Sequence, residues 1–205
     1  MTCVTLMTKH KGIRIAAVSL MLLVPFSRMY LGCHTPLDVG VAFILAIVLA
    51  LALRPVFLIS EQKPSLLWGL LCLSLLVTVL YLAFVSFYSF PADIDAENFY
   101  SGVKNAYTLT VCLVGLMVSK ALDDRFIHFQ PMAVWWAQVL KVALGLGLMV
   151  AIRAGLKAPL QAVMPEFPAT ALRYFIMVLF AATAWPLTFP WFAKLGTKEQ
   201  DRKAA

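Results

Sequence analysis

The chain is poor in charged residues and in cysteine motifs, and these shortages exclude several classes of protein. Only 13% of its 205 residues are charged, whereas 62% are hydrophobic. A typical soluble domain has about 25% charged and 45–50% apolar residues. Together with a mean hydropathy of +0.87, this composition argues against a soluble, disordered or collagen-like chain. It favours an integral membrane protein.

The four cysteines are widely spaced and form no C-x-x-C pair. They are Cys3, Cys33, Cys72 and Cys112. This spacing predicts free thiols rather than a metal site or a disulfide framework. The net charge of +7 does not imply a nucleic-acid partner, because the excess of Lys and Arg in membrane proteins usually lies in cytoplasmic loops.

Six apolar runs have about the length of a membrane-crossing helix, which needs roughly 20 residues. The clearest run has no charged residue between Ser65 and Phe90. In the last run, Pro186 and Pro190 predict a kinked or broken helix end. We therefore predict an all-α, polytopic transmembrane helix bundle of about six spans. The expected spans are 13–31, 39–59, 65–90, 105–122, 132–152 and 174–193.

Lys and Arg are unevenly distributed between the two sets of loops. With the N-terminus in the cytoplasm, eleven of the 17 cations lie on the cytoplasmic side. The five that lie outside are Arg28, Lys104, Arg153, Lys157 and Arg173. The positive-inside rule favours this orientation. The first run also has the basic start and apolar centre of a signal sequence, but Arg28 interrupts it, so we expect it to be retained.

Lys141 is the conspicuous cation within a predicted span. Such a residue usually pairs with a carboxylate, reaches water or marks a functional cavity, and the sequence does not identify which. A nearby stretch, 143–147, contains Gly145 and Gly147, whose small size allows close helix packing.

Polar and ionisable residues gather in the segment Ser27–Asp38, between the first two predicted spans. Thr35, Pro36 and Asp38 have the order of a capping box, which predicts that a helix begins at Pro36. His34 precedes this helix, where free backbone N–H groups and the helix dipole suit a phosphate anion.

Neighbouring side chains could complete a phosphate site. Arg28 could offer a planar fork of donors to the same anion. Asp38 could accept a ring N–H from His34 and leave the other ring nitrogen as a base or nucleophile. Taken singly, however, an arginine, a histidine and an aspartate here are also typical of a topology anchor, a loop residue and a helix cap.

The string S-R-x5-H-x3-D, formed by Ser27, Arg28, His34 and Asp38, resembles the third signature of the type 2 phosphatidic acid phosphatases. This superfamily includes the vanadium haloperoxidases, and the flanking residues resemble its bacterial membrane branch. The resemblance implies that His34 attacks phosphorus and forms a phosphohistidine, and that Asp38 orients it. It implies that Arg28 and Ser27 bind the phosphate, and that neither a metal nor another cofactor is required.

Two further signatures of that superfamily, K-x6-R-P and P-S-G-H, do not occur in this sequence. Residues 1–60 therefore resemble the C-terminal part of a lipid-phosphatase core, and 61–205 a membrane extension of about four spans. We expect this chain alone to be impaired in catalysis. A misassigned start, a truncated gene and a second chain that supplies the missing signatures all remain open.

The resemblance implies hydrolysis of a lipid phosphate or diphosphate, of the phosphatidate or polyprenyl diphosphate class, at the outer leaflet of a bacterial cytoplasmic membrane. The expected partners are this substrate and membrane lipids, and the oligomeric state is open. A non-catalytic membrane fragment or partner subunit is the main alternative. A small transporter, suggested by Lys141, is another.

Overall fold

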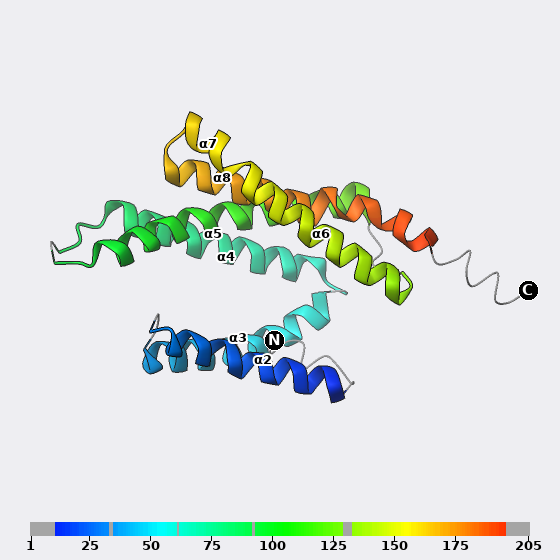
Figure 1. Ribbon diagram of the computed structural model, residues 1–205, viewed down its shortest axis with the longest axis horizontal. Coiled ribbons are helices and arrows are strands. Elements are labelled where there is room, and N and C mark those ends of the chain that lie inside the picture. The colour runs from blue at the N-terminus through cyan, green and yellow to red at the C-terminus, as the bar shows by residue number, and fades with distance from the viewer. Residues whose placement is uncertain (1–10, 33–34, 61, 92, 129–132, 196–205) are drawn as a thin grey trace, which may run out of the picture. The chain divides into compact units, whose positions relative to one another are not determined.

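The computed structural model describes residues 11–32, 35–60, 62–91, 93–128 and 133–195. Within these ranges the chain is almost entirely helical and contains no strand (Figure 1), which confirms the predicted all-α fold. The α-helices are α2 (Lys11–Tyr30), α3 (Pro36–Ser60), α4 (Pro64–Phe87), α5 (Ala96–Leu122), α6 (Trp135–Gly155), α7 (Lys157–Val163) and α8 (Glu166–Leu179). Two π-helices, η1 (Asp123–Ile127) and η2 (Phe180–Ala184), and the 3-10 helix η3 (Pro186–Thr188) follow α5 and α8.

Five helical segments in the described residues are long and apolar enough to cross a membrane. They are Pro36–Ser60, Pro64–Phe87, Ala96–Ile127, Trp135–Val163 and Glu166–Leu195. They correspond to five of the six expected spans. The remaining one, α2, forms a 20-residue helix that carries Lys11, Arg14 and Arg28 and is not among these five. Its membrane crossing stays a prediction.

Two of the helices begin earlier than the apolar pattern predicts. We expected a span from 105, but α5 begins at Ala96 because the Asp95 side chain accepts a hydrogen bond from the Asn98 backbone N–H at 2.9 Å. Similarly, α8 begins at Glu166 rather than near 174. Polar residues in these first turns lower the hydropathy without interrupting the helix, so the helices extend beyond the apolar core.

The chain divides into two compact units, Met1–Leu70 and Leu71–Ala205. Unit 1 contains α2, α3 and the first turns of α4, and unit 2 contains the rest of α4 and the helices that follow. The predicted signature segment lies in unit 1. The expected division into a phosphatase core and an extension stays a prediction.

In unit 2, the closest packing joins α5 and α8 through small residues. Ala106, Gly115 and Ser119 are buried on α5, and Ala169, Thr170 and Ala171 on α8. A Cβ atom on Gly115 would lie 3.2 Å from side-chain atoms of Phe175 and Val178. Because lipid is as apolar as a leucine side chain, close backbone approach rather than hydrophobicity favours this pairing.

Helix α4 is joined to α5 by hydrogen bonds between side chains and backbone. Tyr81 Oη donates to the Gly102 carbonyl at 3.4 Å, and Thr110 Oγ1, which donates to the Ala106 carbonyl of its own helix at 2.9 Å, lies 3.3 Å from the Thr78 carbonyl. Such bonds across helices typically contribute about 0.6 kcal/mol each in a membrane, so they fix the register of the pair more than its stability.

The end of the last span is broken, as the prolines predict. The α-helix α8 stops at Leu179 and continues as the π-helix η2, in which Trp185 N–H donates to the Phe180 carbonyl at 2.7 Å. Pro186 has no N–H and its ring would clash with the carbonyl four residues earlier. This explains why α-helical hydrogen bonding cannot continue through it.

One face of α6 packs against this broken end. Ala137, Lys141 and Gly145, spaced four residues apart, are buried. The Lys141 Nζ atom lies 4.0 Å from the centroid of the Phe189 ring, and Trp185 packs on Gly145. A cation over an aromatic face is attracted by the ring quadrupole. An aromatic ring is therefore one of the contacts of Lys141 that the sequence did not identify.

The two glycines of the 143–147 stretch provide a test of this packing. A Cβ atom on Gly145 would lie 2.7 Å from Trp185 Nε1, whereas one on Gly147 would meet nothing within 4 Å. Alanine favours a helix over glycine by about 1 kcal/mol, and overpacking costs about 1–3 kcal/mol. Thermal unfolding in detergent should therefore show Gly147→Ala as stable as the native chain or more so, and Gly145→Ala as less stable than Gly147→Ala by about 1–3 kcal/mol. Equal melting of the two variants would contradict the contact.

Candidate functional site

A residue with a left-handed backbone conformation ends α2 within the segment Ser27–Asp38. Gly32 has a φ angle of +69°, and its N–H donates to the Met29 carbonyl at 3.0 Å. Glycine adopts this conformation without the steric cost that a Cβ atom adds, and it commonly follows the last turn of a helix. Gly32 therefore ends the helix that carries Ser27 and Arg28.

The predicted capping box at the start of α3 is confirmed. Thr35 backbone N–H and Thr35 Oγ1 both donate to Asp38 Oδ2, at 3.1 and 2.8 Å, and Asp38 N–H donates to Thr35 Oγ1 at 3.2 Å. Pro36 is the first helical residue, as expected. These reciprocal bonds satisfy donors that the first turn of a helix otherwise leaves unpaired.

The structure places the predicted site residues at two helix ends. Ser27 and Arg28 lie in the last turn of α2, and Asp38 lies in the first turn of α3. His34 lies between these ends but outside the described residues, as does the side chain of Arg28. The three helical residues thus flank His34 along the chain, while contacts of its imidazole stay a prediction.

Two of the predicted site residues already make local hydrogen bonds. Ser27 Oγ donates to the Val24 carbonyl at 2.8 Å, so its hydroxyl must rotate before it can donate to a phosphate. Asp38 Oδ2 accepts the two bonds from Thr35. Because a carboxylate can accept about four hydrogen bonds, capping by Asp38 is compatible with a further bond to His34.

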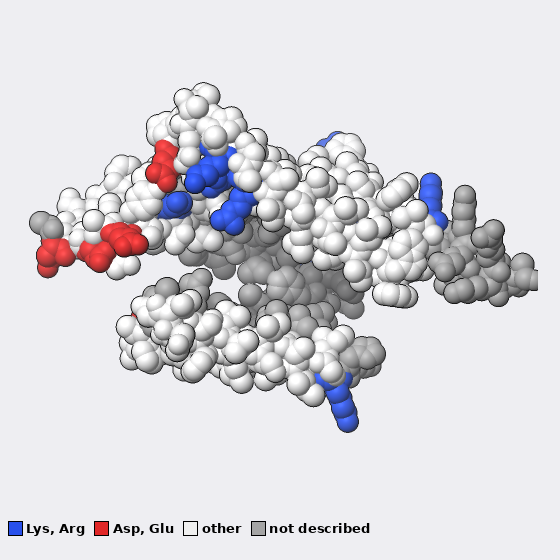
Figure 2. Space-filling model, in the orientation of Figure 1, with Lys and Arg blue, Asp and Glu red and all other residues white. Residues whose placement is uncertain are grey.

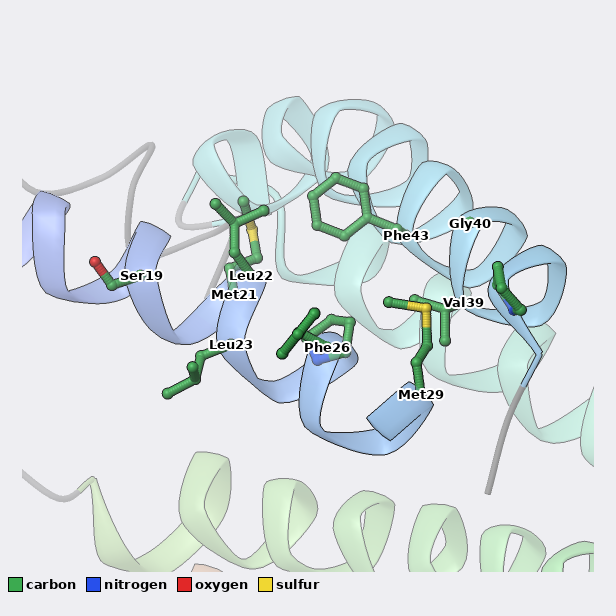
Figure 3. A pocket seen from close by; sticks show the side chains of 11 residues that line it. Ser19, Met21, Leu22, Leu23, Phe26, Met29, Val39, Gly40 and Phe43 are labelled. Carbon is green, nitrogen blue, oxygen red and sulfur yellow. The ribbon is translucent and has the colours of Figure 1, made fainter. Parts of the chain in front are cut away.

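An apolar cavity of about 680 Å³ lies between α2 and α3 (Figure 3). Phe26 and Met29 line it from α2, and Val39 and Phe43 line it from α3. Pro36, the first residue of α3, also borders it. The cavity can therefore hold an apolar chain whose polar end reaches the start of α3.

Groups of three or more metal-ligating side chains do not occur among the described residues. Cys72 and Cys112 are free thiols in this part of the chain. The N-terminus of α3, at Pro36, is the positive end of a helix dipole, which suits an anion.

The fold and these helix ends define an integral membrane protein with a candidate anion site between two of its helices. A family model described as "PAP2 superfamily phosphatase, transmembrane extension" matches residues 107–199, from α5 to beyond η3. Searches of the curated proteins and of the solved structures found no match. Residues 107–199 lie outside the predicted third signature, so this match independently supports membership of the chain in the PAP2 superfamily.

The sequence analysis did not predict the contact between polar residues near the starts of α5 and α8. Tyr100 Oη donates to Glu166 Oε1, and Lys104 Nζ lies 3.6 Å from the same oxygen. Glu166 is 62 positions from Lys104 and 66 from Tyr100 along the chain. Their contact could be predicted only if α5 and α8 were already known to be neighbours. The sequence feature that could have drawn attention to Lys104 is that it is one of the five cations on the predicted outer side.

The capping box can be tested with two substitutions of one residue. Thr35→Ala removes the hydroxyl that accepts from Asp38 N–H, which typically costs about 1 kcal/mol. Hydrogen exchange of the first turn of α3 should accelerate roughly fivefold, whereas Thr35→Ser should exchange like the native chain. If both variants exchange alike, the cap does not hold the start of α3.

Proposed function

We propose that the protein takes part in hydrolysis of a lipid phosphate or diphosphate, of the phosphatidate or polyprenyl diphosphate class, with His34 as the nucleophile. The observation that carries the proposal is the third-signature string at Ser27, Arg28, His34 and Asp38. Its last member lies in a helix N-terminus that forms as expected. The PAP2 match over residues 107–199 supports the same superfamily from another part of the chain.

The proposed reaction divides the work among these residues. A ring nitrogen of His34 attacks phosphorus, a P–N bond forms, and the bond from phosphorus to the leaving oxygen breaks. Asp38 holds the imidazole, and Arg28 and the positive end of the α3 dipole stabilise charge on the phosphoryl oxygens. Water then hydrolyses the phosphohistidine. Loss of one such donor typically costs about 2.7–4 kcal/mol of transition-state stabilisation.

The apolar cavity supports a lipid rather than a soluble phosphoester as substrate. Its lining residues include Phe26, Met29 and Phe43, and it borders the start of α3. Because the surrounding bilayer is equally apolar, an acyl or prenyl chain gains little free energy by entering. The cavity therefore aligns the lipid, while contacts with the phosphate supply the affinity.

We propose that this reaction occurs at the outer leaflet of a bacterial cytoplasmic membrane. The unequal distribution of Lys and Arg between the loops favours a cytoplasmic N-terminus. The segment that contains His34 then faces outward.

A non-catalytic membrane subunit is the second candidate. The observation that favours it is that neither K-x6-R-P nor P-S-G-H occurs in the sequence. The second of those signatures would supply the general acid, which typically contributes 10²–10⁴ to the rate.

The leaving group distinguishes these two candidates. A lipid alkoxide needs protonation as it departs, whereas p-nitrophenolate does not. We expect the purified full chain in proteoliposomes to form an acid-labile phosphohistidine with p-nitrophenyl phosphate. Hydrolysis of phosphatidate by the same preparation should be roughly 10²–10⁴ slower, because no general acid assists.

Matched histidine variants provide the control. His34→Asn should abolish both the phosphohistidine and the release of p-nitrophenol. His128→Asn should leave both unchanged, since His128 has a φ angle of 47°, which asparagine tolerates. Hydrolysis that survives His34→Asn would contradict the proposal. Absence of phosphohistidine in the native chain would favour the non-catalytic candidate.

A further inference from the structure

Thr35 and Asp38 are joined by one more hydrogen bond than a helix cap requires. A capping box consists of two bonds, each between a side chain of one residue and the backbone N–H of the other. These are the bonds from Thr35 N–H to Asp38 Oδ2, at 3.1 Å, and from Asp38 N–H to Thr35 Oγ1, at 3.2 Å. The third bond joins the two side chains, because Thr35 Oγ1 donates to Asp38 Oδ2 at 2.8 Å. It satisfies no backbone donor, so the start of α3 does not need it.

The third bond restricts the orientation of the Asp38 carboxylate. Two donors of Thr35 meet the same oxygen, Oδ2, so a rotation of the carboxyl group would break both bonds. A hydroxyl that donates to an ionised carboxylate also makes a stronger bond than one that joins neutral groups. Because Oδ1 is attached to the same carbon, its direction is fixed together with that of Oδ2.

Asp38 is the one acidic residue among residues 1–60 of the sequence. On the face of the molecule drawn in Figure 2, the side chains of α2 and α3 are almost all uncharged. These two helices therefore carry no second carboxylate able to orient the imidazole of His34 in place of Asp38. The direction of this one side chain consequently determines whether the proposed nucleophile is held.

Thr35 is also the residue that follows His34 in the chain. Its backbone N–H, which donates to Asp38 Oδ2, belongs to the peptide unit that joins Thr35 to His34. Thr35 thus connects the carboxylate to the backbone beside the proposed nucleophile. In an imidazole, the hydrogen bond made by one ring nitrogen sets which nitrogen carries the proton. A carboxylate of fixed direction therefore selects one tautomer.

We propose that Thr35 is a positioning residue, whose hydroxyl holds the Asp38 carboxylate so that Oδ1 accepts the ring N–H of His34. The imidazole is thereby kept in one tautomer, with its other nitrogen available to attack phosphorus. Thr35 itself contacts neither the phosphate nor the leaving group. This inference rests on the roles proposed above for His34 and Asp38, and it adds the residue that sets the geometry between them.

Substitutions of Thr35 separate the cap from the third bond. Glycine caps a helix almost as well as threonine but has no hydroxyl, so Thr35→Gly keeps most of the cap and loses the third bond. Thr35→Ser keeps both. Thr108→Ala is the matched control, because Thr108 Oγ1 donates at 2.8 Å to the Lys104 carbonyl of its own helix, α5. It removes the same hydroxyl elsewhere and should leave the tautomer of His34 and the reaction rate unchanged.

The tautomer of His34 is measured by NMR on the full chain in detergent, with histidine labelled in its ring nitrogens. The sequence has three histidines, His10, His34 and His128, and His34→Asn identifies the signals of His34. Above the pH at which the imidazole ionises, the native chain and Thr35→Ser should show one tautomer of His34. Thr35→Gly should show a mixture of two, which loss of the cap alone would not produce. The same tautomer ratio in the native chain and in Thr35→Gly would overturn the proposal.

Phosphohistidine formation from p-nitrophenyl phosphate provides the second measurement. Thr35→Gly should lower the maximal rate about tenfold or more, because a hydrogen bond to a charged group is lost. KM should change little, since Thr35 does not contact the phosphate, and Thr35→Ser should react like the native chain.

The two measurements distinguish this inference from the proposed hydrolysis. A single tautomer that Thr35→Gly abolishes, in a native chain that forms no phosphohistidine, supports the positioning by Thr35 and contradicts the hydrolysis. Phosphohistidine that forms equally fast in the native chain and in Thr35→Gly supports the hydrolysis and contradicts the positioning.

Discussion

The need to pair every backbone N–H and C=O inside the helices determines where this protein can hold chemistry. Lipid offers no hydrogen bonds, so a chain that crosses it must be helical throughout the apolar region. Unpaired donors then occur only at helix ends. The segment between α2 and α3 lies at such ends. The candidate site thus follows from this constraint.

The close packing of helices inside unit 2 depends on small side chains rather than on polar contacts. Small residues on α5 and α8 allow close contact, and Gly145 admits the Trp185 ring against α6. Lys141 is the exception, with a buried amine over the Phe189 ring. The π-helix η2 places that ring after a break in α8, so the broken helix also contributes a contact to the intramembrane cation.

Features that depend on neighbouring residues could be predicted from the sequence. The capping box needs only Thr35 to Asp38, and the break near Pro186 follows from the missing N–H of proline. The helix starts at Ala96 and Glu166 were predicted too late. Hydropathy identifies the apolar part of a helix, whereas the start of α5 is set by the polar cap that Asp95 forms with the Asn98 N–H.

Which helices would be neighbours could not be predicted. Spans such as α3 and α4 are apolar on all sides, so no hydrophobic face indicates a partner, and small residues occur on several helices. The pairing of Glu166 with Tyr100 and the position of Phe189 over Lys141 both depend on that arrangement. For the candidate site, the sequence identified Ser27, Arg28, His34 and Asp38, and the structure describes the two helix ends that flank His34.

The most direct test of this account is the side of the membrane on which these helix ends lie. In a chain whose native cysteines are replaced by serine, Leu31→Cys, Ala158→Cys and Phe126→Cys are labelled separately with a membrane-impermeant maleimide in intact cells. Leu31 and Phe126 are 72% and 69% exposed, so access to both is unobstructed within the chain. The account predicts that Leu31→Cys and Ala158→Cys react from outside, and that Phe126→Cys reacts only after permeabilisation. Labelling of Leu31→Cys only in permeabilised cells would contradict it.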